Sequence, residues 1–262
     1  MYRALILVMF IMLAACSQDE MLQKFSSPED RATTEKYVEL LRAHNFSEIE
    51  KATDPSVKET DIHGKLEEMA RLLPSGKITS VKLIGAQTHK TPGMTIKNTT
   101  LEYNYDGKWV LANVAIQEKN GAKTIVGFNI VPQPGSQESI NRFTLSNKSI
   151  LHYTVLSAAF LGLVISLFAL LRCMRSKSIT KKWKWIVFII FGFGKLTINW
   201  TTGQWNLTPI SFQLFSASAV APFYGPWNIA ASLPIGAVVF LLMRKKLLAP
   251  KPNCKVDDPT NS

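Results

Sequence analysis

Acidic side chains are nearly missing from the second half of this 262-residue chain. After residue 150 the only acids are Asp257 and Asp258, although the chain carries 30 Lys and Arg against 19 Asp and Glu. The segment 16–150 holds as many acids as bases, so the net charge of +11 lies almost entirely beyond it. A basic protein often binds nucleic acid, but the neutral middle has no basic stripe with interleaved aromatics. We therefore predict no nucleic-acid partner.

Motifs of enzymatic chemistry are also missing. His44, His63 and His89 are not spaced as metal ligands, and the chain has neither a Gly-x-Ser-x-Gly nucleophile motif nor a glycine-rich phosphate-binding loop. We predict no catalytic residue, no metal and no cofactor. Whether the protein is an enzyme stays open, and the sequence favours a protein without enzymatic activity.

The amino terminus has the pattern of an export signal. A basic residue and an apolar run over 4–12 precede the sequence Leu13-Ala14-Ala15-Cys16. This sequence resembles the lipobox of bacterial lipoproteins, and the resemblance implies that Cys16 is acylated and becomes the first residue of the mature chain. Because Cys173 and Cys254 lie beside or beyond basic segments, we expect no disulfide.

The middle of the chain changes from a helical period to a period of two. Apolar spacing predicts helices near 28–44, 47–52 and 59–73, and alternation predicts strands around 78–84, 100–105, 109–116 and 124–131. Asp106-Gly107 and Asn120-Gly121 are hairpin signals between alternating runs. Three helices followed by a four-stranded antiparallel meander predict an α+β domain over 27–135.

This order of elements resembles the cystatin-like or nuclear-transport-factor-like fold, a curved sheet filled by helices. The resemblance implies a cone that is an enzyme pocket, a ligand pocket or a packed core, so it does not select an activity. Tyr103, Tyr105 and Trp109 are candidate ligand contacts. Aromatic residues at this spacing are also ordinary core residues.

Long apolar runs after residue 149 predict an all-α membrane region of three transmembrane helices. The run 150–171 has no charge, and Ala158, Gly162 and Ser166 recur along it at a spacing that lets another helix approach closely. The predicted organisation is a signal peptide 1–15, linkers 16–26 and 136–149, transmembrane helices 150–171, 185–200 and 227–243, a basic cytoplasmic loop 172–184, an outer-face loop 201–226, and a cytoplasmic tail 244–262.

Basic clusters give the orientation. Export places residues 16–149 outside, so the first span runs inward and brings the basic residues of 172–184 to the cytoplasm. Three spans then leave the carboxy terminus inside, whereas a fourth span over 210–221 would leave the last basic cluster outside. We therefore expect an interfacial or re-entrant segment at 210–221. The location implied is the bacterial cytoplasmic (inner) membrane, with the lipid bilayer as partner.

The outer-face loop is rich in aromatic residues and almost free of charge. Tryptophan and tyrosine settle at membrane interfaces without a partner, and they also serve as rigid docking anchors. Lys195, Trp200, Trp205 and Tyr224 are therefore candidate contacts for a membrane or envelope protein. The sequence favours a membrane-anchored envelope lipoprotein with an exported binding or scaffolding domain; the alternative is a tethered enzyme with its site in the cone.

Overall fold

The computed structural model describes residues 22, 26–58, 61–176, 179 and 181–248. The chain divides into two compact units. Unit 1 takes the described residues up to Arg142 together with Pro222–Gly225, and unit 2 takes Phe143–Ala221 and the described residues from Pro226 onward. The lipobox and Cys16 lie outside the described residues.

Unit 1 begins with three helices, α3 (Pro28–Arg42), α4 (Phe46–Ala52) and α5 (Ile62–Arg71). The start of α3 is a capping box: the hydroxyl of Ser27 accepts from the amide of Asp30, and the Asp30 carboxylate accepts from the amide of Ser27, both at 3.1 Å. Pro28 at the first helical position reinforces this start. The three predicted helices are confirmed.

The sheet of unit 1 is an antiparallel meander of four strands in sequence order, β1 (Ile78–Thr91), β2 (Met94–Tyr105), β3 (Lys108–Lys119) and β4 (Ala122–Gln133). Asp106 and Gly107 have φ angles of 49° and 90°, and Asn120 and Gly121 have 53° and 78°. Two consecutive positive φ angles make the tight turn that suits a twisted hairpin. The predicted α+β class is confirmed for this unit.

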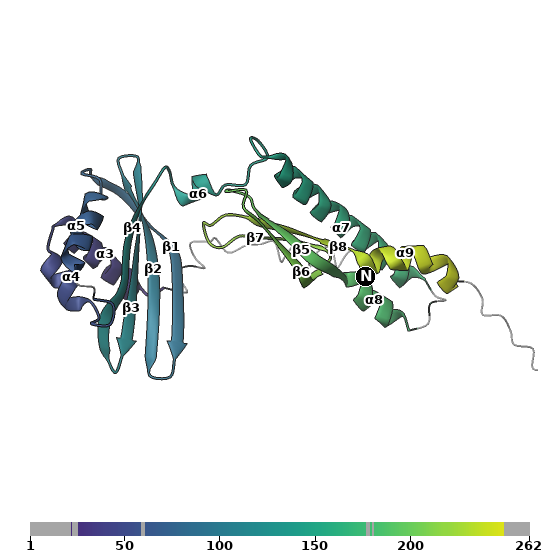
Figure 1. Ribbon diagram of the computed structural model, residues 1–262, viewed down its shortest axis with the longest axis horizontal. Coiled ribbons are helices and arrows are strands. Elements are labelled where there is room, and N and C mark those ends of the chain that lie inside the picture. Colours follow the sequence, from purple (N-terminus) through teal and green to yellow (C-terminus); the bar gives the residue numbers. More distant parts are fainter. Residues whose placement is uncertain (1–21, 23–25, 59–60, 177–178, 180, 249–262) are drawn as a thin grey trace, which may run out of the picture. The chain divides into compact units, whose positions relative to one another are not determined.

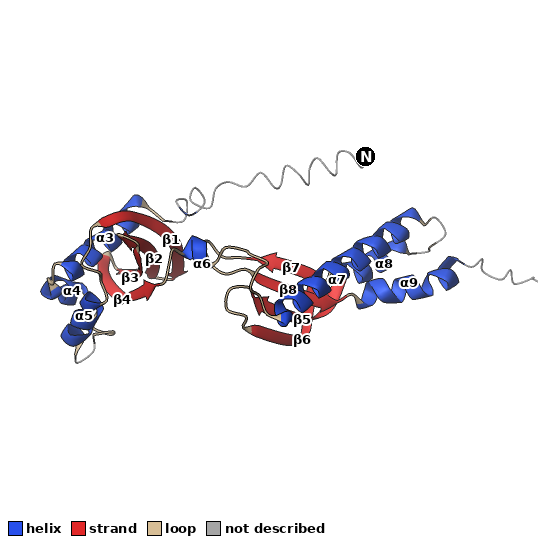
Figure 2. Ribbon diagram, turned by 90° about the horizontal axis from the view of Figure 1, so that it is seen from above, coloured by secondary structure: helices blue, strands red, loops and turns tan. Residues whose placement is uncertain are grey.

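The core of unit 1 lies between the sheet and the helices that cover one of its faces (Figure 1). Leu101, Tyr103 and Tyr105 alternate along β2 toward this core and are at most 3% exposed. Figure 2 shows the curvature of the sheet around the helices. After β4, in the predicted linker 136–149, the short helix α6 (Gln137–Ile140) follows.

Unit 2 corrects the prediction of an all-α region. Helix α7 (Ile150–Arg175) occupies the first predicted span, but the second, 185–200, is helix α8 (Lys182–Ile190) followed by strand β5 (Phe191–Asn199). The third, 227–243, is strand β8 (Asn228–Leu233) followed by helix α9 (Ile235–Leu248). The predicted loop 201–226 contains β6 (Trp205–Leu214) and β7 (Ala217–Val220).

The four strands form an antiparallel sheet in the order β6-β5-β8-β7. Gly192 and Gly194 weaken a helix at the start of β5, and a left-handed φ of 67° at Gly194 is incompatible with one. Ile198 in the second apolar run pairs with Ile229 in the third. Each run therefore contains a strand at the point where the other run can pair with it. Among the described residues, α7 is the one helix long and apolar enough to cross a membrane.

The small residues of α7 face the sheet, not another helix. A Cβ atom on Gly162 would lie 3.2 Å from the Cβ of Ser216, in the turn between β6 and β7. Ser166 is fully buried, with its hydroxyl 3.4 Å from that of Ser216, whereas Ala158 is exposed. The predicted close approach therefore occurs at two of the three positions, and its partner is a β-turn.

Candidate functional site

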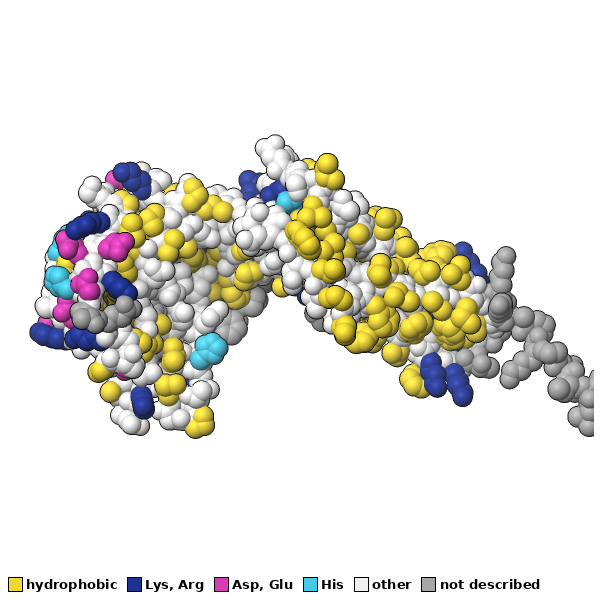
Figure 3. Space-filling view, viewed as in Figure 1, with side chains coloured by type: hydrophobic (Ala, Val, Ile, Leu, Met, Phe, Trp, Pro, Cys, Tyr) yellow, Lys and Arg dark blue, Asp and Glu magenta, His cyan; other side chains and the backbone are white. Residues whose placement is uncertain are grey.

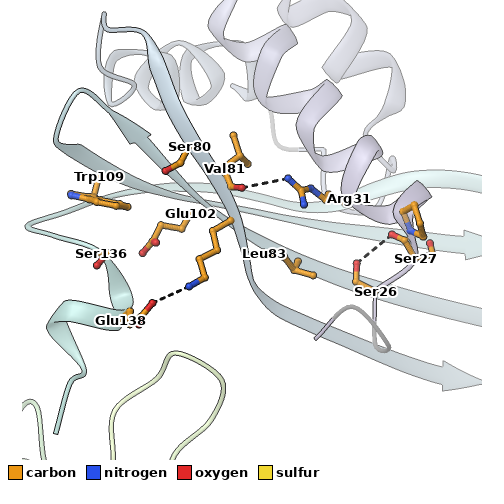
Figure 4. Close-up of a pocket in the computed structure, with 12 residues that line it drawn as sticks. Ser26, Ser27, Arg31, Ser80, Val81, Leu83, Glu102, Trp109, Ser136 and Glu138 are labelled. Carbon is orange, nitrogen blue, oxygen red and sulfur yellow. Dashed lines mark hydrogen bonds and ion pairs between the residues drawn. The ribbon is translucent and has the colours of Figure 1, made fainter. Parts of the chain in front are cut away.

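A groove of about 760 Å³ follows strand β1, the edge strand of the unit 1 sheet. Its volume lies in the usual range of small-molecule sites. Figure 4 shows that the lining comes from both sides of β1: Ser26, Ser27 and Arg31 on one side, and Glu102 and Trp109 on the other. The groove therefore follows the sheet edge and borders the filled core, because Leu83 belongs to both.

Glu102 is the buried acid of this groove. It lies on β2 with its side chain opposite the core-facing Leu101 and Tyr103, and it is only 3% exposed. The backbone amide of Gln137, at the start of α6, donates to its carboxylate over 2.5 Å. Burial raises the pKa of Glu102, and the hydrogen bond from Gln137 and the charge of Lys82 offset only part of that effect.

Lys82 extends the network toward α6 and the Pro222–Gly225 segment of unit 1. Its ammonium lies 2.9 Å from the carboxylate of Glu138 and 4.1 Å from the ring centroid of Tyr224. The carbonyl of Tyr224 accepts from the side-chain amide of Asn141 over 2.8 Å. A carboxylate, an ammonium group and an aromatic ring thus meet beside the shielded acid.

Arg31 closes the other side of the groove. Its guanidinium is 2.8 Å from the Glu35 carboxylate on the same helix and donates to the carbonyl of Val81 over 3.4 Å. Val81 lies on the edge strand β1, so Arg31 supplies a side-chain donor to a strand that pairs only with β2 among the described strands. The groove therefore offers a flat indole, serine hydroxyls and groups of both charges, which suits a polar ligand with one apolar face.

The structure separates the three aromatic residues predicted as ligand contacts. Trp109 lines the groove. Tyr103 and Tyr105 lie on the opposite face of the sheet, where they stack on each other with ring centroids 6.1 Å apart inside the core. Neither phenol hydroxyl has a hydrogen-bond partner among the residues that the structure describes, and burial raises the pKa of both groups. Tyr103 also borders a second groove of about 340 Å³ beside α3.

Several groove residues were not predicted from the sequence: Glu102, Arg31, Lys82 and Glu138. A usable signal did exist for Glu102, because it is a charged residue between apolar Leu101 and Tyr103 in the middle of a strand. No local pattern indicates that α6, 35 residues later, covers it.

Unit 2 carries a second candidate surface, which we call the apolar band. It consists of the large outward-facing side chains of α7. The buried side of the helix includes smaller residues: Gly162 and Ser166 lie against the β6–β7 turn, and Ala169 packs in the cluster with α8 and α9. Phe160 and Leu161 are 65% and 57% exposed. Figure 3 shows hydrophobic side chains gathered over this unit. The exposed residues of the band are Ile150, Tyr153, Phe160, Leu161, Val164, Leu167, Phe168, Leu171 and Met174.

Aromatic clusters mark both ends of α7. Near its start, the ring centroids of His152 and Trp200 are 5.1 Å apart, and Phe143 stacks on Trp200 at 4.8 Å. Beyond its end, Trp185 lies 5.6 Å from Phe240, in the cluster that joins α7, α8 and α9. The basic residues Arg172, Arg175, Lys181, Lys182, Lys184 and Arg244 lie near the ends of these helices.

The other predicted contact residues take different positions in the structure. Trp200 is 1% exposed, and its indole nitrogen donates to the carbonyl of Thr144 over 2.8 Å. Trp205 at the start of β6 is 60% exposed, and Lys195 is half-buried in β5. Tyr224 belongs to unit 1, whereas the other three residues belong to unit 2.

Comparison with known proteins gives no assignment: no family model, no curated protein and no solved structure matches this chain.

Proposed function

We propose that the protein is a lipoprotein of the bacterial cell envelope, held in the cytoplasmic membrane by unit 2, whose exported unit 1 binds a ligand or partner. The observation that carries this proposal is the outward face of α7. Large apolar side chains on the outside and small or hydroxylated ones on the inside are the reverse of a water-soluble core. Such an arrangement is stable where the surrounding solvent is hydrocarbon.

The length of α7 supports a transmembrane position. From His152 to Cys173 the helix rises about 32 Å, which matches a hydrocarbon layer of about 30 Å. Trp200 packs at one end of this stretch, and Trp185 belongs to the helix cluster at the other. Tryptophans at both interfaces are typical of membrane proteins. The open edges of β6 and β7 need polar partners, so the sheet belongs in the outer half of the bilayer, where headgroups and water reach it.

Charge supports the orientation. The basic residues at the end of α7 and the start of α8 satisfy the positive-inside rule if α7 runs inward. Residues 16–149 are then outside, the carboxy terminus is cytoplasmic, and acylated Cys16 supplies a second anchor.

Unit 1 is proposed as the binding module, with a cystatin-like or nuclear-transport-factor-like sheet. Its core is filled, so the groove along β1 is the place for a ligand. Glu102 and Trp109 supply a shielded acid and a flat aromatic face, a combination suited to orienting a small ligand or a peptide side chain.

Membrane integration is tested on the full chain by alkaline carbonate extraction of cell membranes. We expect the protein to stay in the membrane fraction, and we expect the same of Cys16→Ser, because α7 holds the chain without the lipid. Release of Cys16→Ser into the supernatant would show that the lipid is the only anchor and would overturn the role of unit 2.

Orientation is tested with single cysteines and a membrane-impermeant maleimide. Lys90→Cys at the β1–β2 hairpin should react in intact spheroplasts, and Lys182→Cys at the start of α8 should react only after permeabilisation. The reverse pattern would contradict the proposed topology. Mass spectrometry of the mature chain should find acyl groups on Cys16.

A further inference from the structure

An apolar groove of about 590 Å³ lies within unit 2, between α7 and the edge strand β7. Leu156, Phe160 and Leu163 line it from α7, Ala217 and Ala219 from β7, and Trp227 comes from the segment just before β8. Its volume is within the range of sites that hold a single small molecule.

The lining is almost entirely carbon. Its one hydroxyl, on Ser218, already accepts a hydrogen bond from the side-chain amide of Gln213 over 2.8 Å. A polar occupant would lose its hydrogen bonds to water and find few replacements, which is costly in an apolar environment. The groove is therefore suited to a hydrocarbon chain.

The groove is continuous with the apolar band. Phe160 belongs to both, and the neighbouring Leu161 and Val164 are exposed on the band. If the band faces lipid, as the proposed function holds, then the groove opens onto the same lipid. An acyl chain from that leaflet can enter it without crossing water, gaining contact with the walls of the groove.

The ammonium group of Lys148 lies near the end of the groove that Phe143 lines. Phe143 lines the groove and stacks on Trp200, whose carbonyl accepts from the ammonium of Lys148 over 2.7 Å. Trp200 thus connects Lys148 to the wall of the groove. Because there is no Asp or Glu between residues 139 and 256, unit 2 offers Lys148 no carboxylate within its described part. An anionic headgroup complements this charge.

We propose that unit 2 binds an anionic phospholipid of the outer leaflet, with one acyl chain in the groove and the phosphate near Lys148. This inference rests on the proposed membrane position of unit 2. It adds a specific lipid site to a surface that otherwise faces the bilayer without selectivity.

The test uses the full-length protein in phosphatidylcholine vesicles that contain phosphatidylglycerol with a photoreactive diazirine in one acyl chain. After illumination, peptide mass spectrometry locates the label. We expect several-fold more label on the groove residues Leu156, Leu163 and Ala219 than on the band residues Leu167 and Phe168. Equal labelling of groove and band would overturn the inference.

Two variants with the same substitution separate the groove from the band. Ala219→Trp fills the groove from the exposed strand β7, and Ala158→Trp adds the same ring to the exposed side of α7, outside the groove lining. Labelling of the groove should fall several-fold in Ala219→Trp and stay unchanged in Ala158→Trp. Equal labelling in both variants would contradict the site.

Lys148→Gln tests the headgroup. We expect it to lower groove labelling by photoreactive phosphatidylglycerol several-fold and to leave labelling by photoreactive phosphatidylcholine unchanged. The same loss for both lipids would refute a role for the anionic phosphate.

Other occupants have distinct signatures. If the acyl group on Cys16 fills the groove, photoreactive phosphatidylglycerol will label the groove only in Cys16→Ser. If a second copy of the chain fills the groove, chemical crosslinking through Ala219→Cys will give dimers that added lipid does not separate. Either result overturns the phospholipid site. A chain that carbonate extracts from the membrane refutes the proposed function itself, whereas a chain that stays integrated without groove labelling refutes only this inference.

Discussion

The two units of this chain distribute polar and apolar side chains in opposite ways. Unit 1 buries Leu41, Leu101 and Ile125 and carries all the ion pairs found among the described residues. Unit 2 exposes large apolar side chains on α7 and buries the polar cluster Ser166, Gln213, Ser216 and Ser232. The same chain therefore follows two different rules for its surface.

The difference teaches that burial alone does not identify a core. In water, apolar surface is removed from solvent because its exposure costs free energy. In hydrocarbon this cost vanishes, and close packing of small residues and internal hydrogen bonds hold elements together instead. The side chain of Gln213 donates to Ser218 and accepts from Ser232, which joins three strands of the unit 2 sheet.

A large difference between the two units is expected from a charge placed on the apolar band. Leu161→Lys puts an ammonium group near the middle of α7, which costs about 2.5–3.5 kcal/mol in membrane insertion. We expect the carbonate-resistant fraction of the protein to fall sharply. Leu72→Lys places the same charge on a 40%-exposed leucine of unit 1 and should leave that fraction unchanged. Equal effects of the two substitutions would contradict the claim that unit 2, and not unit 1, is embedded in the membrane.

Shortening a leucine side chain to alanine should affect unit 1 more than unit 2. Leu101 is fully buried in the unit 1 core, so Leu101→Ala should cost about 2–5 kcal/mol of its unfolding free energy. Leu161→Ala removes the same atoms from an exposed site and should change the stability of unit 2 by less than about 0.5 kcal/mol. The urea dependence of limited proteolysis on the solubilised full chain measures both. A large loss in Leu161→Ala would indicate that the band is covered by protein.

The fold of unit 1 was predictable because its signals are local. Asp106-Gly107 and Asn120-Gly121 specify the turns, and the alternating residues between them specify the faces of the strands. Ser27 and Pro28 marked the start of α3 in the same way. Each of these features depends on neighbours within a few positions.

The fold of unit 2 was not predictable from apolar length. The run 185–200 is long enough for a short span, but Gly192 and Gly194 weaken a helix there, and the strand that forms has a bulge between Phe193 and Lys195. Its partner in the central pairing, Ile229, lies about thirty residues away from Ile198 and has no local signature. In the candidate site, the sequence predicts Trp109. It marks Glu102 only as a charged residue in a strand, because the helix that covers it is 35 residues away.

A pH dependence should follow from Glu102. Burial raises its pKa above the ordinary value of 4.5. Because the pKa of Glu102 is higher in the folded state, protonated Glu102 stabilises the fold relative to the unfolded chain. This stabilisation is complete below pH 4.5 and is lost as the pH rises through the folded pKa. Glu102→Gln keeps an acceptor for the Gln137 amide but cannot ionise. We expect this variant to lose less stability between pH 4.5 and neutrality than the unchanged protein.

Melting of unit 1 at several pH values checks this prediction, with Glu138→Gln as the control. Glu138 is exposed, and its charge raises the pKa of Glu102 less than burial does, so its replacement should leave most of the difference at Glu102 in place. Parallel pH curves for Glu102→Gln and the unchanged protein would show that the groove does not shield this carboxyl.

The smallest expected effects compare polar groups inside the two units. The Tyr105 hydroxyl is buried in unit 1 with no hydrogen-bond partner in the described part of the chain, whereas Ser232 in unit 2 donates to Gln213. Removing an unpaired group relieves a desolvation cost, but removing a paired one leaves its partner unsatisfied. We expect Tyr105→Phe to raise the stability of unit 1 by about 1 kcal/mol and Ser232→Ala to lower that of unit 2 by about the same amount. Urea-dependent proteolysis of each unit measures both, and a loss of stability in Tyr105→Phe would mean that its hydroxyl has a partner, such as a bound water or a ligand.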